Sequence, residues 1–359
     1  MSSLLGGGCI PGQDFDARLN QIVEPHLFSI AGWEFKTLLQ EIEQWLSGSQ
    51  AEEIEDEVRV VTEYFDSLER KSALAGTVEQ IIQKQIQDTL AQQGIFNPLT
   101  EGEFSFPPVN FRLEELPHLL VISPRDRIDS TNEIILQQGF TKTEKEAVEA
   151  RVDELGVSSL VVDIGGIATY PALVDSQANL RFTIDTTTEE WLHHYLSFTP
   201  LGFRYLLDLS GLSRNYEIAT LNESLAGMVS KEIGDLVYRK YYSEYENEIV
   251  QKPESEFDFN SEMRTIRKTV DAYLVRGEIE QAEEFMERKR QYLVSKGHYI
   301  RKLNQAYFAF YGTYAHTPAF ISPIGLELRE LRNRSTSLKD FLDTAAAMTS
   351  RQELRDSVR

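Results

Sequence analysis

Residues 188–194 read Thr-Glu-Glu-Trp-Leu-His-His, and residues 222–223 read Asn-Glu near the start of another segment with apolar residues at helical spacing. Side chains four positions apart lie one above the other on an α-helix. We therefore expect Glu189 and His193 to project from one face of a helix. Glu223 is expected on a second helix of the same helical block.

These residue types match what a catalytic zinc ion requires. Such an ion takes three protein donors, keeps a position open for water, and needs a nearby carboxylate to accept the water's proton. Glu189, His193 and Glu223 are the candidate metal ligands, and Glu190 is the candidate general base. Beside Glu223, the second helix carries small residues that allow another helix to approach closely, namely Ala226, Gly227 and Ser230.

The same stretch also fits an ordinary helix start. Thr186-x-x-Glu189 and Thr187-x-x-Glu190 both match a capping box, and the helix dipole favours glutamates in a first turn. The two histidines fit ordinary interfacial residues. The metal site is favoured by a coincidence of spacing: Glu-Glu-x-x-His precedes Asn-Glu-x-x-Ala at a helix start, and both follow a strand that a Gly-Gly pair breaks.

Composition narrows the possible functions. The 359 residues are 41% hydrophobic, which is enough for a sizeable core in one large domain or two. A formal net charge of −21 argues against nucleic-acid binding, which requires a basic surface. No apolar run reaches the roughly 18 residues of a membrane span. The sequence also contains no phosphate-binding loop, dinucleotide fingerprint or nucleophile elbow.

The single cysteine, Cys9, excludes an internal disulfide framework and a cysteine-based zinc cluster. Its setting, LLGGGC over residues 4–9, is similar to the end of a lipoprotein signal, although the basic leader and long apolar run of such signals are missing. We expect a flexible N-terminus over residues 1–14. Localisation is left open between the cytoplasm and attachment to a bacterial cell envelope through a truncated N-terminus around Cys9.

Residues 15–100 are expected to form a helical region. Apolar residues at helical spacing predict two helices within 15–50, and steps of three and four continue from Ile54 to Leu68 and from Val78 to Leu90. Gly76 is expected to mark a turn or kink, which gives a long antiparallel hairpin of coiled-coil character. We expect this hairpin to be a separable appendage.

The remainder is expected to be α+β and predominantly helical, with a small sheet followed by a helical block over residues 101–348 and a C-terminal tail over 349–359. A helix is expected over 143–155. Strands are expected over residues 119–123, 157–163 and 167–174. Further helices are expected over about 186–198, 220–247, 258–275, 278–297, 299–313 and 337–347.

Residues 157–241 resemble the gluzincin superfamily of zinc metallopeptidases, whose pattern is an edge strand, an H-E-x-x-H helix and a second helix bearing Asn-Glu. More narrowly, four runs are similar to those of an uncharacterised bacterial family with an intact H-E-W-x-H motif. They are residues 122–127 (ISPRDR), 190–196 (EWLHHYL) with 200–202 (PLG), 221–223 (LNE) and 301–308 (RKLNQAYF). The resemblance implies a zincin-like domain after the hairpin, zinc as the cofactor, and hydrolysis of peptide or protein substrates by metal-activated water.

Carried over by position, the resemblance makes His193 and Glu223 zinc ligands and Glu190 the general base, whereas Glu189 stands where the pattern has its first histidine. A carboxylate can bind zinc, but an anionic donor makes the metal a poorer Lewis acid. Without a metal, the crowded carboxylates are expected to raise at least one carboxyl pKa. The expected function is therefore a metallopeptidase weakened at position 189 or, alternatively, an inactive zincin-fold protein that binds a protein or peptide.

The gluzincin pattern also places an electrophilic side chain opposite the water. Tyr311, Tyr314 and His316 are candidates because an aromatic-rich segment after a helix can close over a site. Tyr205 is a further alternative. Buried tyrosines at helix ends are also common packing residues.

Overall fold

The computed structural model describes residues 11–28, 56–66, 71–100, 102–210, 212–213, 215–246, 257–312 and 323–359. The chain forms two compact units, each assembled from three separate stretches. Unit 1 contains Met1–Ser29, Pro117–Asp163 and Ser261–Phe310, and unit 2 contains Ile30–Leu116, Ile164–Asn260 and Tyr311–Arg359. The division differs from the expected boundary near residue 100, because the chain on both sides of that position belongs to unit 2.

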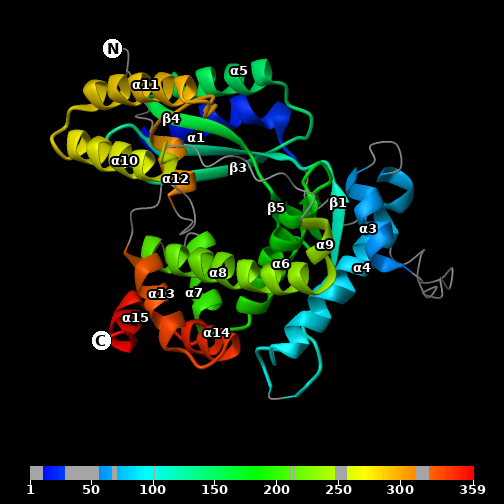
Figure 1. The fold of residues 1–359 in the computed structure, drawn as a ribbon. Helices are drawn as coiled ribbons and strands as arrows, with labels where there is room; N and C mark the ends of the chain where they lie inside the picture. Colours follow the sequence, from blue (N-terminus) through cyan, green and yellow to red (C-terminus); the bar gives the residue numbers. More distant parts are fainter. Residues whose placement is uncertain are drawn as a thin grey trace, which may run out of the picture. The chain divides into compact units, whose positions relative to one another are not determined.

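Unit 1 is built on an antiparallel sheet of order β3-β2-β4, whose strands are β2 (His118–Pro124), β3 (Asn132–Leu136) and β4 (Val157–Asp163). Its helices are α1 (Pro11–Val23), α5 (Lys142–Asp153), α10 (Phe259–Val275), α11 (Ile279–Ser295) and α12 (Gln305–Tyr311), and the short 3-10 helix η1 (Glu24–His26) follows α1 (Figure 1). Thr141 and Glu144 form a capping box that starts α5. The expected strands at 119–123 and 157–163 are confirmed, whereas β3 was not expected.

Unit 2 contains a second small sheet of order β1-β6-β5. Strand β1 (Phe111–Glu114) runs parallel to β6 (Ala172–Asp175), and β5 (Gly166–Ile167) pairs antiparallel with β6 at one edge. The single strand expected over 167–174 is therefore divided in two. The division has a local cause, since the Thr169 hydroxyl donates to the Pro171 carbonyl across 2.8 Å and closes a turn between β5 and β6.

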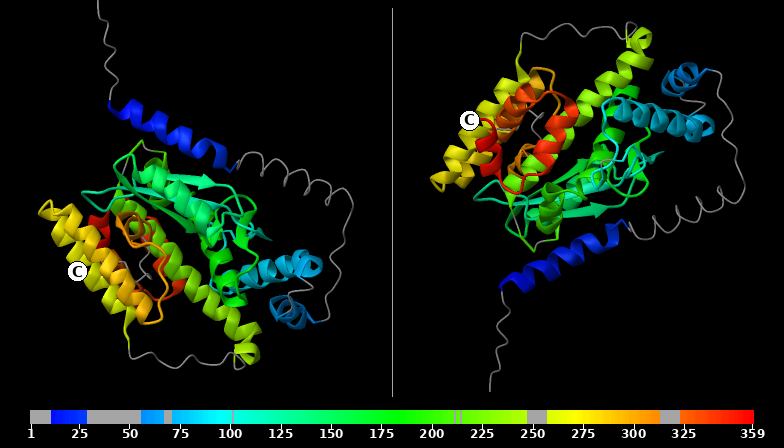
Figure 2. Two further views of the ribbon diagram at one scale, coloured as in Figure 1. Left: turned by 90° about the horizontal axis from the view of Figure 1, so that it is seen from above. Right: turned by 90° about the horizontal axis from the view of Figure 1, so that it is seen from below.

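Helix α8 (Tyr216–Tyr241) is the central helix of unit 2 and packs against α4, α6, α7, α13 and α14. Figure 2 follows this long helix from two further sides, with the red α13 and α15 beside it. The other helices are α3 (Glu57–Asp66), α4 (Lys71–Gln92), α6 (Leu180–Leu196), α7 (Pro200–Leu209), α9 (Ser243–Glu246), α13 (Ile324–Arg334), α14 (Leu338–Ala346) and α15 (Arg351–Ser357). The fold is thus α+β and predominantly helical, as expected.

The helical hairpin is only partly as expected. Helices α3 and α4 pack together, but Gly76 lies inside α4 and marks neither a turn nor a boundary. Val78, Ile82 and Ile86 are fully buried in the same apolar cluster as residues of α6 and α8. The stripe on α4 is therefore part of the core of unit 2 and not the face of an appendage. The two residues at which the first expected stripe begins and ends, Ile54 and Leu68, lie outside the described residues. So does the second helix expected within 15–50.

The chain ends also differ from expectation. Helix α1 begins at Pro11, within the stretch expected to be flexible, while Cys9 lies outside the described residues. The expected tail contains α15, in which Leu354 is fully buried and Arg351 pairs with Glu327 of α13 at 2.8 Å. Helices α7 and α13 were not expected either. Among the helices in the described ranges, none combines the length and the apolar content that crossing a bilayer requires.

Candidate metal site

Helix α6 carries Glu189, Glu190 and His193, and it begins earlier than expected. Its N-cap is Asn179, whose side chain accepts a hydrogen bond of 2.8 Å from the Phe182 amide. The threonines of the two apparent capping boxes therefore lie inside the helix, where both are buried. A capping role for the two glutamates is excluded, because a capping box requires its threonine at the helix start.

Helix α8 brings Glu223 to the same place. It starts at Tyr216, where the Asn215 side chain caps the first turn by accepting from two backbone amides. Glu223 is then followed by a stripe of small buried residues, and α6 packs closely along α8. At Gly234, any β-carbon would collide with Asp185 of α6. The stripe comprises Ala226, Gly227, Ser230 and Gly234.

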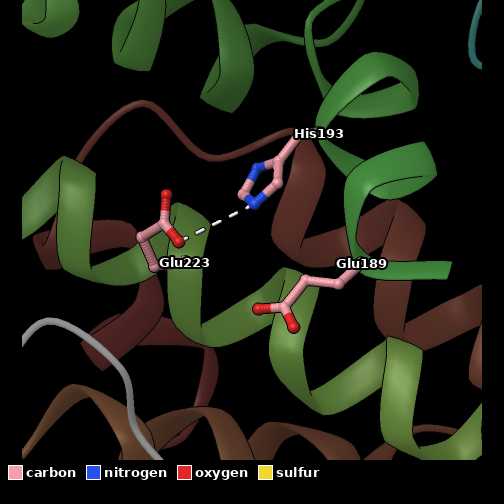
Figure 3. Close-up of side chains that lie close together, drawn as sticks. All are labelled: Glu189, His193 and Glu223. Carbon is pink, nitrogen blue, oxygen red and sulfur yellow. Dashed lines mark ion pairs between the residues drawn. The ribbon is translucent and has the colours of Figure 1, made fainter. Parts of the chain in front are cut away.

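The three candidate ligands meet as predicted (Figure 3). One donor atom from each of Glu189, His193 and Glu223 lies within 4.8 Å of the others, and His193 Nε2 is 3.7 Å from Glu223 Oε2. Zinc–ligand bonds of about 2.0–2.2 Å place tetrahedral ligands about 3.4 Å apart. The widest gap between donor atoms, at most 4.8 Å, would have to shorten by up to about 1.4 Å on metal binding. One nitrogen and two oxygen donors thus form a set that can hold a metal ion.

Tyr205 of α7 orients one of these ligands. Its hydroxyl donates to Glu223 Oε1 across 2.5 Å, while the other carboxylate oxygen, Oε2, faces His193. The Tyr205 ring also lies 6.4 Å from the His193 ring. Among the four proposed electrophilic side chains, Tyr205 is the one placed against the ligands by these contacts. Tyr314 and His316 lie outside the described residues, and Tyr311 ends α12.

Glu190 lies beside the edge strand β5. Its side chain is 9% exposed, and a β-carbon at Gly166 would collide with its carboxyl group. Glycine at 166 therefore makes room for this carboxyl, and Gly165 does the same for the Phe182 ring. His194 of α6 contacts the residue that follows β5, since its Nε2 lies 3.1 Å from the Ala168 carbonyl oxygen. The Gly-Gly pair of the sequence is thus explained by the contact between β5 and α6.

The site is electrostatically crowded. Burial raises the pKa of Glu189 to about 7 and that of Glu190 to about 8, and repulsion from Glu223 adds to both shifts. Burial alone would lower the pKa of His193, but the three surrounding carboxylates outweigh it and raise this pKa. The expected rise in a carboxyl pKa is therefore found, with burial as its larger cause.

The helices that form the site also contain spare hydrogen-bonding capacity. Within the described part of the chain, the hydroxyls of Thr187, Thr220 and Ser224 are buried without a hydrogen-bond partner. Asn222 is buried beside them, and a hydrogen bond from its side chain helps to raise the pKa of His193. Most buried polar groups in proteins are paired. No local pattern predicts this feature, because burial of these hydroxyls follows only from the packing of α6 on α8.

Comparisons with protein-family models, with curated proteins and with solved structures find no match to this chain. The interpretation of the site therefore depends on its own geometry and on the spacing of its residues.

Proposed function

We propose that this protein is a metal-dependent peptidase of the gluzincin type, in which Glu189, His193 and Glu223 hold a divalent cation and Glu190 is the general base. The observation that supports this proposal is the meeting of three donor atoms within 4.8 Å, with Glu190 on the same helix. A bound cation would supply a polarised water for attack on a peptide carbonyl. Zinc is the proposed cation because the residues match the three-ligand arrangement of catalytic zinc sites.

The roles of the surrounding residues follow from their positions. Glu190 would take a proton from water in its carboxylate form, as general bases do. It lies against Gly166 of β5, whose one partner within the described part of its sheet is β6. An extended peptide can add to such an edge through main-chain hydrogen bonds. Tyr205 would keep Glu223 in position through its hydrogen bond.

One residue favours a second function. Glu189 replaces a neutral imidazole by an anion, which weakens the Lewis acidity of a bound metal and raises the pKa of its water. The alternative is therefore a protein that retains the same fold and edge strand and binds a peptide or protein without cleaving it.

Metal analysis and a restoring variant separate the two functions. The full-length protein, purified without chelators, is expected to contain about one metal ion per chain, and His193→Ala should lose it. Glu232→Gln is the control, because Glu232 is on α8, the helix that carries Glu223, but pairs with Arg332 at 2.6 Å. Glu189→His should raise zinc affinity and peptidase activity. Stoichiometric zinc in that variant, without cleavage of a broad peptide library, would favour the binding function.

A further inference from the structure

Unit 1 contains a cavity of about 500 Å³, far from the metal ligands in sequence and made entirely by its own residues. One wall is helix α11, where Glu283, Met286, Glu287 and Arg290 follow the spacing that places side chains on one helix face. The other wall comes from the ends of β2 and α5, the start of β4 and the segment before α12. The volume lies within the range of about 300–1,000 Å³ typical of small-molecule sites.

Paired charges line the cavity. Arg125, which follows β2, reaches α11 and binds Glu283 through two hydrogen bonds of 2.8 and 2.6 Å. Arg290 binds Glu287 through two bonds of 2.8 Å. Lys302 donates to Asp153 at 2.8 Å. These pairs hold both signs of charge at fixed places around one space.

The charges of the wall are nearly balanced. The cationic residues are Arg125, Arg290, Arg301 and Lys302, and the anionic residues are Asp153, Glu283 and Glu287. Behind this wall, the buried Glu149 binds Arg301 at 2.5 and 2.8 Å and makes the count even. A lining with equal numbers of both charges gives no net electrostatic attraction to a ligand that carries a net charge of either sign. The overall charge of −21 further disfavours an anionic ligand.

The remaining lining is apolar or has an unused acceptor. Met286 is fully buried and Leu303 is 5% exposed, and both contribute to the wall. Gln305 is also fully buried, and its Nε2 donates to the Arg125 carbonyl at 2.8 Å. Gln305 Oε1, however, has no hydrogen-bond partner among the described residues. A buried acceptor of this kind is stabilised by a ligand that donates a hydrogen bond.

We infer that this cavity binds a free α-amino acid with an apolar side chain, of the leucine or methionine class. The ligand would insert between Arg290 and Glu287 and replace their mutual hydrogen bonds, so that the Arg290 guanidinium would take the carboxylate through two parallel hydrogen bonds. Glu287 would take the ammonium group. Met286 and Leu303 would contact the side chain. The inference is independent of the metal site, because no residue of α6 or α8 contributes to the cavity.

Calorimetric titration of the full-length protein with L-leucine tests the inference. L-leucine should bind, whereas N-acetyl-leucine, which lacks the cation, and leucinamide, which lacks the anion, should each bind at least about tenfold more weakly. Inorganic phosphate should neither bind nor compete. The inference would be overturned if the blocked derivatives bound as tightly as leucine, or if phosphate bound in place of leucine. It would also be overturned if neither leucine nor methionine gave heat at a ligand concentration of about 10 mM.

Two exposed pairs on α11 provide matched variants. Glu287→Gln and Arg290→Met remove charges that line the cavity and should each weaken L-leucine binding by about tenfold. Glu284→Gln and Arg288→Met remove a similar pair of the same helix, joined at 3.8 Å, which does not line the cavity. These control variants should bind L-leucine as the parent does. If both sets bind equally, the site is elsewhere, and unchanged melting temperatures show that all four variants are folded.

Discussion

The hydroxyl of Tyr205 is expected to set the metal affinity of the candidate site. Tyr205→Phe removes one oxygen atom and leaves the ring, so the packing of α7 on α8 is kept. The lost bond is a hydrogen bond of 2.5 Å to Glu223 Oε1. Hydrogen bonds to charged groups contribute about 1.5–3 kcal/mol, and loss of a group that orients a metal ligand weakens binding by about 10–100-fold. We expect a loss of that size in zinc affinity.

The assay is competition with a chromophoric zinc chelator, carried out on the full-length protein at neutral pH. Tyr216→Phe is the matched control, since Tyr216 is 48% exposed and its hydroxyl makes a long bond of 3.4 Å to the Gly312 carbonyl. The control should keep the parent affinity. Equal zinc affinity of Tyr205→Phe and the parent, with both proteins folded, would refute the orienting role of Tyr205 and weaken the case that Glu223 is a ligand.

Three further predictions concern catalysis, acid stability and the core. In a Glu189→His background, adding Glu190→Gln should lower peptide hydrolysis by about 10²–10⁴-fold, as loss of a general base does; unchanged rates would remove Glu190 from the mechanism. Hydrogen bonds from His118 and Lys145 lower the pKa of Asp163, so the stability it contributes is present above the unfolded aspartate value of about 3.9 and is lost as pH falls below it. Melting temperatures across pH should therefore fall less steeply in acid for Asp163→Asn, and an identical acid slope would contradict this. Ile82→Ala should lower the free energy of unfolding of the full chain in denaturant by about 2–5 kcal/mol, because Ile82 is fully buried. A change near zero would indicate that α4 is an appendage and not part of the core.

The convergence of the three ligands could be predicted because helix geometry alone determines most of it. Glu189 and His193 are four residues apart, so any helix containing both places them together. Glu223 required only a second helix with a side that permits close approach. The start of α6 could not be found in the same way, because a Thr-Thr-Thr run before two glutamates matches a cap more closely than Asn179 does. Which of these residues caps the helix depends on whether the threonines are buried, and the tertiary packing determines that.

Contacts between distant segments account for the remaining differences. The Tyr205–Glu223 bond joins residues 18 positions apart on two helices, and no local pattern indicates which tyrosine makes it. The two units interleave three stretches each, so no single boundary in the sequence separates them. Similarly, the stripe on α4 predicts an apolar face correctly but does not specify its partner. Periodicity shows which side of a helix is buried, and only the fold shows against what.

When no cation is bound, the charged cluster at the candidate site lowers the stability of the folded protein. Burial raises the pKa of Glu189 and Glu190, which means that their charged forms are less stable here than in water. A cation that binds the folded chain and not the unfolded one offsets this cost and stabilises the protein by about 2.7 kcal/mol at 100 times its dissociation constant. Zinc should therefore raise the melting temperature of the parent and have little effect on His193→Ala. A cluster that binds no cation predicts instead that zinc leaves the melting temperature of the parent unchanged, and that replacing one of its buried carboxylates by glutamine stabilises the fold whether or not zinc is present.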